Sequence, residues 1–298
     1  PVSGTPFAYL HSYIFSLITI FLFISAARKQ KNLLWFLLPF MFFLSFFSMQ
    51  TPSVYIILLV LFSSFYYFIA NRQFKNLKFF FFGSVASFIF FIFFMLLTKT
   101  PLENLLYQYF LFPLSIGEGR WSSEATAYVK LSDQFNFKRL FGDFKFIHIF
   151  YFSLLFTTIN LYFKKIKDML FVNIIILTAC FLFFTNQLMQ ANQIYIFSLV
   201  PLLASILHLN LKNLKFSKFY FITIFILLFF ITGKYHLRYN IDRKFIDIEN
   251  INKHDALNAE NIDVKLKHLN WVSPSSKNSE EEIDIIKKAL VIMKADSR

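Results

Sequence analysis

Eight stretches of the chain contain no Asp, Glu, Lys or Arg, and this feature constrains the fold more than any other. The stretches are 8–27, 33–47, 54–70, 79–97, 146–163, 169–185, 194–209 and 219–232. In a transmembrane helix a central charge costs about 3 kcal/mol, whereas each central Leu, Ile, Phe or Val contributes roughly −0.3 to −0.6 kcal/mol. With their uncharged flanks, the shorter stretches approach the roughly 20 residues that cross a bilayer. The sequence therefore predicts an all-α membrane protein with about eight transmembrane helices.

The composition also favours a lipid environment. Hydrophobic residues make up 57% of the chain and charged residues 16%, compared with about 45–50% and about 25% in soluble domains. An AT-rich genome would favour many of the 46 Phe residues, but codon bias would not separate the charges from the apolar stretches. The net charge of +13 comes from short basic clusters, which argues against a nucleic-acid-binding face. Cys180 is the single cysteine, so no disulfide framework is predicted.

Basic residues lie in every second connection between the apolar stretches. The four clusters are Arg28, Lys29 and Lys31; Arg72, Lys75 and Lys78; Lys164, Lys165 and Lys167; and Lys212, Lys215 and Lys218. The short connections 48–53 and 186–193 contain no Lys or Arg. The positive-inside rule then places the basic connections in the cytoplasm and the N-terminus, the other connections and the C-terminal segment on the opposite side. Eight spans are needed to keep this alternation.

The long connection 98–145 is predicted to be extracytoplasmic and to begin with a helix on the membrane surface. Thr100 and Glu103 suggest a capping box around Pro101. An apolar stripe at helical spacing follows, formed by Leu102, Leu105, Leu106, Tyr109 and Phe110. Such a stripe is typical of a helix that lies in the interface. Pro113 is expected to end the helix, and Pro52 is expected to break a tight hairpin between the second and third spans.

Residues 233–298 differ in composition from the transmembrane part, 1–232, and we interpret them as an extracytoplasmic soluble segment. Val264, Leu266 and Trp271 predict a strand, and a capping box from Ser279 to Glu282 predicts an amphipathic helix. One strand and one helix do not form a core, so we expect a small, incomplete α/β segment. The chain begins at Pro1 without a Met or a signal peptide, which favours an internal fragment.

The chain contains no metal-ligand spacing, nucleophile elbow or phosphate-binding loop. The Gly117-Glu118-Gly119 triplet follows no predicted strand, so it does not indicate nucleotide binding. His11 lies near the outer end of the first span. It is either an interfacial anchor or an ionisable group that faces a cavity between helices, where such groups are usually functional.

The order of the remaining motifs resembles the C-terminal two-thirds of a GT-C-type glycosyltransferase. The motifs are Pro6-Phe7 with His11 and Ser12, the hairpin tip Ser48-Met49-Gln50-Thr51-Pro52, the long loop with its surface helix, Asn192-Gln193-Ile194-Tyr195 leading to Pro201, and the soluble tail. This superfamily includes the dolichyl-phosphate-mannose protein mannosyltransferases and the bacterial aminoarabinose transferases of lipid A. The resemblance covers most of residues 1–232.

The resemblance implies an enzyme of the bacterial inner membrane that moves a sugar from a polyprenyl-phosphate donor to a lipid, glycan or protein acceptor of the cell envelope. Its catalytic carboxylate is expected in the first extracytoplasmic loop, upstream of Pro1. Related sequences carry a Lys before the Gln-Thr-Pro of the hairpin tip, where this chain has Met49. A divalent metal as cofactor is left open, because the sequence has no feature that indicates one.

Several polar residues on the outer side are predicted to bind substrate. Arg120 could hold the donor phosphate and Trp121 could stack on a sugar ring, unless they are a solvated cation and an interfacial aromatic. Glu118 could orient the acceptor or keep the loop solvated. The amides that could bind sugar hydroxyls or cap helices are Gln50, Gln187 and Gln193. The alternative function is a transporter or lipid flippase, although the spans contain no charge and Gly83 as their single glycine.

Overall fold

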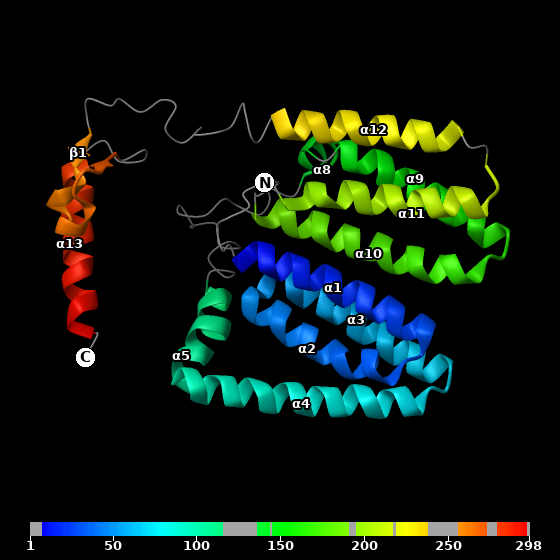
Figure 1. Cartoon of the computed structure of the whole chain (residues 1–298), viewed down its shortest axis with the longest axis horizontal. Coiled ribbons are helices and arrows are strands. Elements are labelled where there is room, and N and C mark those ends of the chain that lie inside the picture. The colour runs from blue at the N-terminus through cyan, green and yellow to red at the C-terminus, as the bar shows by residue number, and fades with distance from the viewer. Residues whose placement is uncertain are drawn as a thin grey trace. The chain divides into compact units, whose positions relative to one another are not determined.

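The computed structural model describes residues 8–115, 136–143, 145–190, 195–216, 219–237, 256–272 and 279–296. The chain divides into two compact units, a larger one over residues 2–232 and a smaller one over residues 233–298. The described part of the larger unit is built from helices that run back and forth along one direction (Figure 1).

Six helices of the larger unit are long and apolar enough to cross a membrane. They are α1 (Ala8–Lys29), α3 (Gln50–Ala70), α4 (Phe74–Thr98), α9 (Lys145–Phe163), α10 (Lys167–Gln190) and α12 (Phe219–His236). Two more helices of the larger unit are shorter. The apolar helix α2 (Asn32–Ser48) has 17 residues, and α11 (Leu199–Asn213) has 15 and follows a 3-10 turn, η2 (Tyr195–Ser198). Each of the eight overlaps one predicted stretch. An all-α fold with several helices of membrane length is therefore present, as the sequence predicts.

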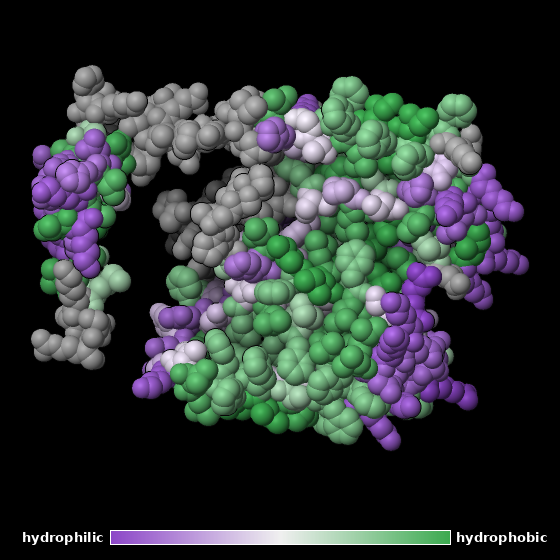
Figure 2. Space-filling view, in the orientation of Figure 1, coloured by the Kyte–Doolittle hydropathy of each residue, from purple (hydrophilic) through white to green (hydrophobic). Residues whose placement is uncertain are grey.

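The helices bury their largest side chains between neighbours and expose other apolar side chains outward. Fully buried residues include Phe23, Trp35 and Phe68 among α1–α3, and Phe150 and Phe183 in α9 and α10. By contrast, α4 and α12 expose most of their Phe side chains, and the surface over these helices is strongly apolar (Figure 2). This distribution is compatible with a multi-pass membrane protein, in which the outer face contacts lipid instead of water.

The predicted hairpin between α2 and α3 has its break at Met49 and Thr51. Met49 is extended, with φ −168° and ψ 138°, and it ends α2. Thr51 has non-helical angles within the first turn of α3, and its peptide bond to Pro52 is cis. The residue before a proline is biased away from the helical region, which explains why the break precedes Pro52. We call residues 48–52 the hairpin tip.

The surface helix differs in two ways from the prediction. It comprises α5 (Leu102–Leu106), a π-helical segment η1 (Tyr107–Leu111) and a helical turn over 112–115. No capping box forms, because Pro101 is at the N-cap position and the Thr100 hydroxyl lies 2.8 Å from that of Thr98. Pro113 does not end the helix either, since the wider π-helical segment before it leaves room for the pyrrolidine ring. Residues 116–135 lie outside the described residues, and the short helix α8 (Phe137–Asp143) leads into α9.

The described part of the smaller unit contains a two-stranded pairing and one long helix. Strand β1 (Leu257–Asn258) pairs antiparallel with β2 (Asn270–Trp271), and α13 (Ser279–Asp296) follows. The predicted strand is wrong at Val264 and Leu266, which lie in a 3-10 turn, η7 (Val264–Leu266), because the Asp263 carboxylate accepts a hydrogen bond from the Lys265 amide. A second 3-10 turn is η6 (Ala259–Asn261).

Helix α13 forms where its amphipathic pattern predicts. The Glu282 carboxylate accepts a hydrogen bond from the Trp271 indole N–H at 3.2 Å, so it fixes the helix to β2. Ile283, on the next position, is buried, whereas Ile292 and Met293 are exposed. Two strands of two residues each do not form an α/β core.

Candidate functional site

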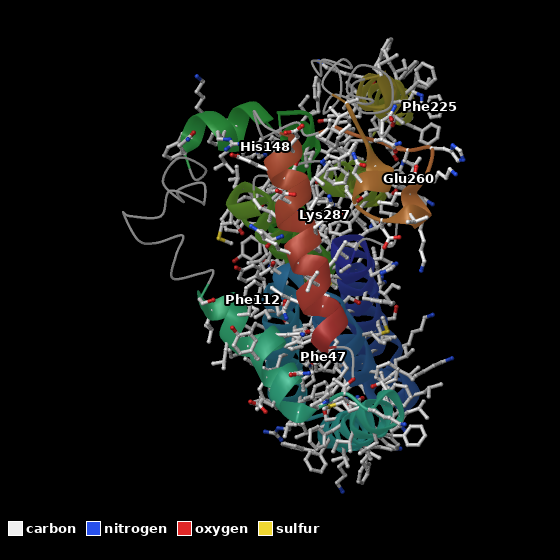
Figure 3. The ribbon with its side chains drawn as sticks, turned by 90° about the vertical axis from the view of Figure 1, so that its left-hand side faces the viewer. Phe47, Phe112, His148, Phe225, Glu260 and Lys287 are labelled. Carbon is white, nitrogen blue, oxygen red and sulfur yellow. The ribbon has the colours of Figure 1, made fainter. Side chains whose placement is uncertain are left out.

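The sequence-predicted site residues that the structure describes lie at one end of the larger unit. This tip end holds the start of α1, the hairpin tip, the surface helix and the end of α10 (Figure 1). His11, Gln50 and Gln187 lie there. The predicted site residues that fall outside the described residues are Glu118, Arg120, Trp121 and Gln193. Figure 3 is turned to show this side, with Phe47 of α2 and His148 of α9 labelled.

Three buried serines join the hairpin tip to α1. The Ser53 hydroxyl donates to the Ser45 carbonyl at 2.6 Å, and the Ser12 and Ser53 hydroxyl oxygens lie 2.6 Å apart. The Ser12 hydroxyl therefore shares its single hydrogen between Ser53 and the Met49 carbonyl, which lies 3.0 Å away. The structure thus brings together two short motifs that are 37 residues apart in the sequence.

The surface helix is fixed to the same hairpin tip by Tyr109. Its phenol donates to the Phe47 carbonyl at 3.0 Å, and the two rings pack with centroids 5.3 Å apart. The half-buried Gln50 donates its amide N–H to the Tyr109 carbonyl at 3.5 Å. Pro113, four residues later, has no N–H to donate to this carbonyl. Gln50 therefore contacts the surface helix through its amide nitrogen.

The end of α10 and the turn η2 contact α1 through a second set of polar side chains. The Asn186 amide donates to the Tyr9 hydroxyl at 3.0 Å, and the Ser198 hydroxyl donates to the Tyr13 hydroxyl at 2.9 Å. Gln187 is also buried, yet neither its amide oxygen nor its amide nitrogen has a hydrogen-bond partner in the described part of the chain. Buried amides without a partner are rare in native proteins and indicate a bound water or ligand.

The polar side chains that join α1 to Asn186 and Ser198 are all neutral hydrogen-bonding groups, and Gln187 follows Asn186 directly. Hydroxyls and amides can bind a polyhydroxylated or amide-bearing ligand, but they do not supply a general acid or base near neutral pH. Comparison with known protein families, curated proteins and solved structures finds no match to this chain. The chemistry of the tip end therefore carries the functional inference.

His11 and His148 occupy different environments at the tip end. The His11 side chain is exposed on the first turns of α1, next to Ser12 but off the buried face of the helix. His148 is buried, with its Nε2 atom 2.6 Å from the Leu140 carbonyl, so it connects α9 to α8. No group of three or more metal-ligating side chains occurs within the described ranges.

Sequence reasoning missed the tyrosines and Asn186, although one pattern could have found them. The buried polar residues at the start of α1 are Tyr9, Ser12, Tyr13 and Ser16, with spacings of three and four. Polar residues that recur at this spacing in an apolar helix form one stripe. In a membrane helix such a stripe faces neighbouring helices, so it predicts the face of α1 that contacts α3 and α10.

Proposed function

We propose that this chain forms the membrane part of a glycosyltransferase that moves a sugar from a polyprenyl-phosphate donor to a lipid, glycan or protein acceptor on the extracytoplasmic side. The observation that carries the proposal is the buried, unpartnered amide of Gln187 beside Asn186. Amide groups match the donors and acceptors of sugar hydroxyls. The serine-held hairpin tip and Gln50 at the same end add to the resemblance of the motif order to GT-C enzymes.

In this proposal eight helices span the bilayer. Helix α2, with 17 residues, is about 26 Å long at 1.5 Å per residue, close to the roughly 30 Å thickness of the hydrocarbon core. Helix α11 completes a span together with η2. The basic turns face the cytoplasm and the tip end faces outward, in accord with the positive-inside rule. Residues 233–298 are then extracytoplasmic, and the membrane is the bacterial inner membrane.

The surface helix provides a place where the lipid donor could lie. Leu102, Leu106 and Phe110 are exposed on it, and apolar side chains at the interface contact acyl or isoprenoid chains. The proposed phosphate and sugar contacts of Arg120 and Trp121, and the acceptor contacts of Glu118 and Gln193, complete this site. The catalytic carboxylate is expected upstream of Pro1. A divalent metal, if the enzyme uses one, would need ligands beyond the described residues, which contain no group of three or more His, Cys, Asp or Glu side chains that could hold it.

The experiment is a transfer assay with the full-length protein in membranes, including any sequence that precedes Pro1. Polyprenyl phosphates carrying labelled sugars are the donors. Gln187→Leu is expected to lower kcat/KM about tenfold or more through loss of one buried polar contact to substrate. Asn213→Leu is the control, because Asn213 is exposed at the last position of α11, away from the tip end; it should change turnover by less than about twofold.

Two further results are needed to interpret the assay, namely the stability of the variant and the fate of the labelled lipid. Gln187→Leu should not lower the free energy of unfolding, because the amide that it removes has no partner in the described structure. Lost activity is then separable from misfolding. Absence of transfer with every donor, or full activity of Gln187→Leu, contradicts the proposal. Movement of the labelled lipid across vesicles without sugar transfer would favour a flippase instead.

A further inference from the structure

The opposite end of the larger unit forms a second polar surface that has no role in the proposed sugar transfer. It consists of the turns between α1 and α2, α3 and α4, α9 and α10, and α11 and α12, and we call it the basic end (Figure 1). Hydrophilic side chains gather there in Figure 2. Its exposed cations are Arg28, Lys29, Lys31, Arg72, Lys75, Lys78, Lys164, Lys165, Lys167, Lys212 and Lys215.

The cations in the first half of the basic end have no acidic neighbour in their own helices. The first acidic residue of the chain is Glu103, so residues 1–102 contain none. The Tyr67 hydroxyl donates to the Ala27 carbonyl at 3.0 Å, which holds the end of α3 against the last turn of α1. Two basic turns, 28–31 and 72–78, are therefore neighbours. Like charges on neighbouring turns repel one another unless an external anion neutralises them.

The turns hold these cations on a rigid backbone. Arg72, Lys165 and Lys215 each adopt a left-handed conformation, with φ between 53° and 57°. In each turn the following N–H bonds a helix carbonyl five residues back, for example Gln73 to Phe68 at 2.9 Å. The N–H of the left-handed residue itself bonds the carbonyl three residues back, for example Arg72 to Ile69 at 3.3 Å. Together the two hydrogen bonds end the helix at a fixed point. A cation there also faces the negative end of the helix dipole.

Large apolar side chains are interspersed with the cations along the sequence of the basic end. Phe74, Phe163 and Phe216 are each more than half exposed, and each is adjacent in sequence to a residue of a basic cluster or one position away from it. Phe74 begins α4, whose Phe side chains are mostly exposed, and Phe163 ends α9. A soluble polyanion would leave them in water, whereas a bilayer surface takes the rings into its interface and offers phosphates to the cations.

From this charge and these interspersed apolar side chains we infer that the basic end binds the headgroups of anionic phospholipids, with the turns 28–31 and 72–78 as its strongest site. The ligand is the phosphate of a membrane lipid, held by several exposed Arg and Lys side chains. The inference is independent of sugar transfer, because its test requires no turnover.

The test measures lipid selectivity of the full chain. The protein is reconstituted in bilayers that contain equal amounts of phosphatidylcholine and phosphatidylglycerol, extracted in mild detergent, and analysed by native mass spectrometry for retained lipid. Phosphatidylglycerol should be retained in preference, and the preference should fall with added salt. The variant Arg72→Gln/Lys75→Gln/Lys78→Gln should lower the ratio of the two lipids by about tenfold to about a hundredfold, the upper value corresponding to about fivefold for each of the three cations.

The matched control is Lys99→Gln/Lys138→Gln/Lys265→Gln. Its three residues are exposed cations outside the basic end, and Lys99 has the same left-handed conformation as Arg72, with φ 53°. The control should leave the lipid ratio within about twofold. Equal retention of the two lipids, or an equal loss in the control, overturns the inference. Displacement of phosphatidylglycerol by soluble polyglutamate at the same charge concentration would also overturn it, because the surface would then bind polyanions in general.

Discussion

Helices α1–α4 and helices α9–α11 form two groups, and the contact between α2 and α4 in the first group differs from the contacts within the second. In the first group, α2 and α4 approach so closely that a Cβ atom at Gly83 would collide with the Phe36 carbonyl. In the second group, the Asn173 amide donates to Asn210 and the Asn210 amide donates to Thr157, both at 3.1 Å. Because lipid gives helices little hydrophobic reason to associate, either close backbone approach or buried hydrogen bonds must stabilise the contact.

The largest effect is expected for Gly83→Ala. The new methyl group would force α2 and α4 apart and should lower the free energy of unfolding by about 3 kcal/mol, as in an overpacked core. Unfolding in mixed micelles by titration with a denaturing detergent measures this change. Gly142→Ala is the control, because a Cβ atom there meets nothing within 4 Å. Equal stability of the two variants would show that α2 and α4 are not in backbone contact.

Asn210→Leu should have the next largest effect, in the second group. It removes two buried hydrogen bonds and leaves the Asn173 amide without a partner, which should cost about 2 kcal/mol. Asn213→Leu, at an exposed position of the same helix, should cost less than about 0.5 kcal/mol. The double variant Asn173→Leu/Asn210→Leu should lose less than the sum of the two single variants, since no polar group is then left unpaired. Strict additivity would argue against the amide chain.

Ser12→Ala tests the hydroxyl contact that joins the hairpin tip to α1. The substitution should lower the free energy of unfolding by about 1 kcal/mol, the typical value of one buried hydrogen bond. Ser16 provides a close control: it is equally buried on the same helix, but its hydroxyl has no partner among the described residues. Ser16→Ala should therefore be neutral or slightly stabilising. If the two variants are equally stable, the serine network does not hold the tip.

The sequence predicts the helices of this chain better than it predicts their contacts. Absence of charge locates the helices because the penalty for a buried charge acts at each position separately. The site depends on pairs such as Tyr9 and Asn186, which are 177 residues apart, and the composition of either stretch does not specify its partner. The same reason applies to Glu282: the local sequence does not show that its carboxylate accepts a hydrogen bond from Trp271, eleven residues earlier.

The smallest effect is expected at the seam between the two groups, where the Asn186 amide meets the Tyr9 hydroxyl. A double-mutant cycle with Tyr9→Phe and Asn186→Leu should give a coupling energy of about 0.6 kcal/mol, the average for hydrogen bonds between membrane helices. A cycle of Tyr9→Phe with Asn210→Leu should give no more than about 0.3 kcal/mol, because those positions lie toward opposite ends of the unit. Gln187 follows Asn186 directly, so this seam fixes its position. Zero coupling would mean that the neighbouring amide is not held in place, and Gln187 could not be a preorganised contact for a sugar.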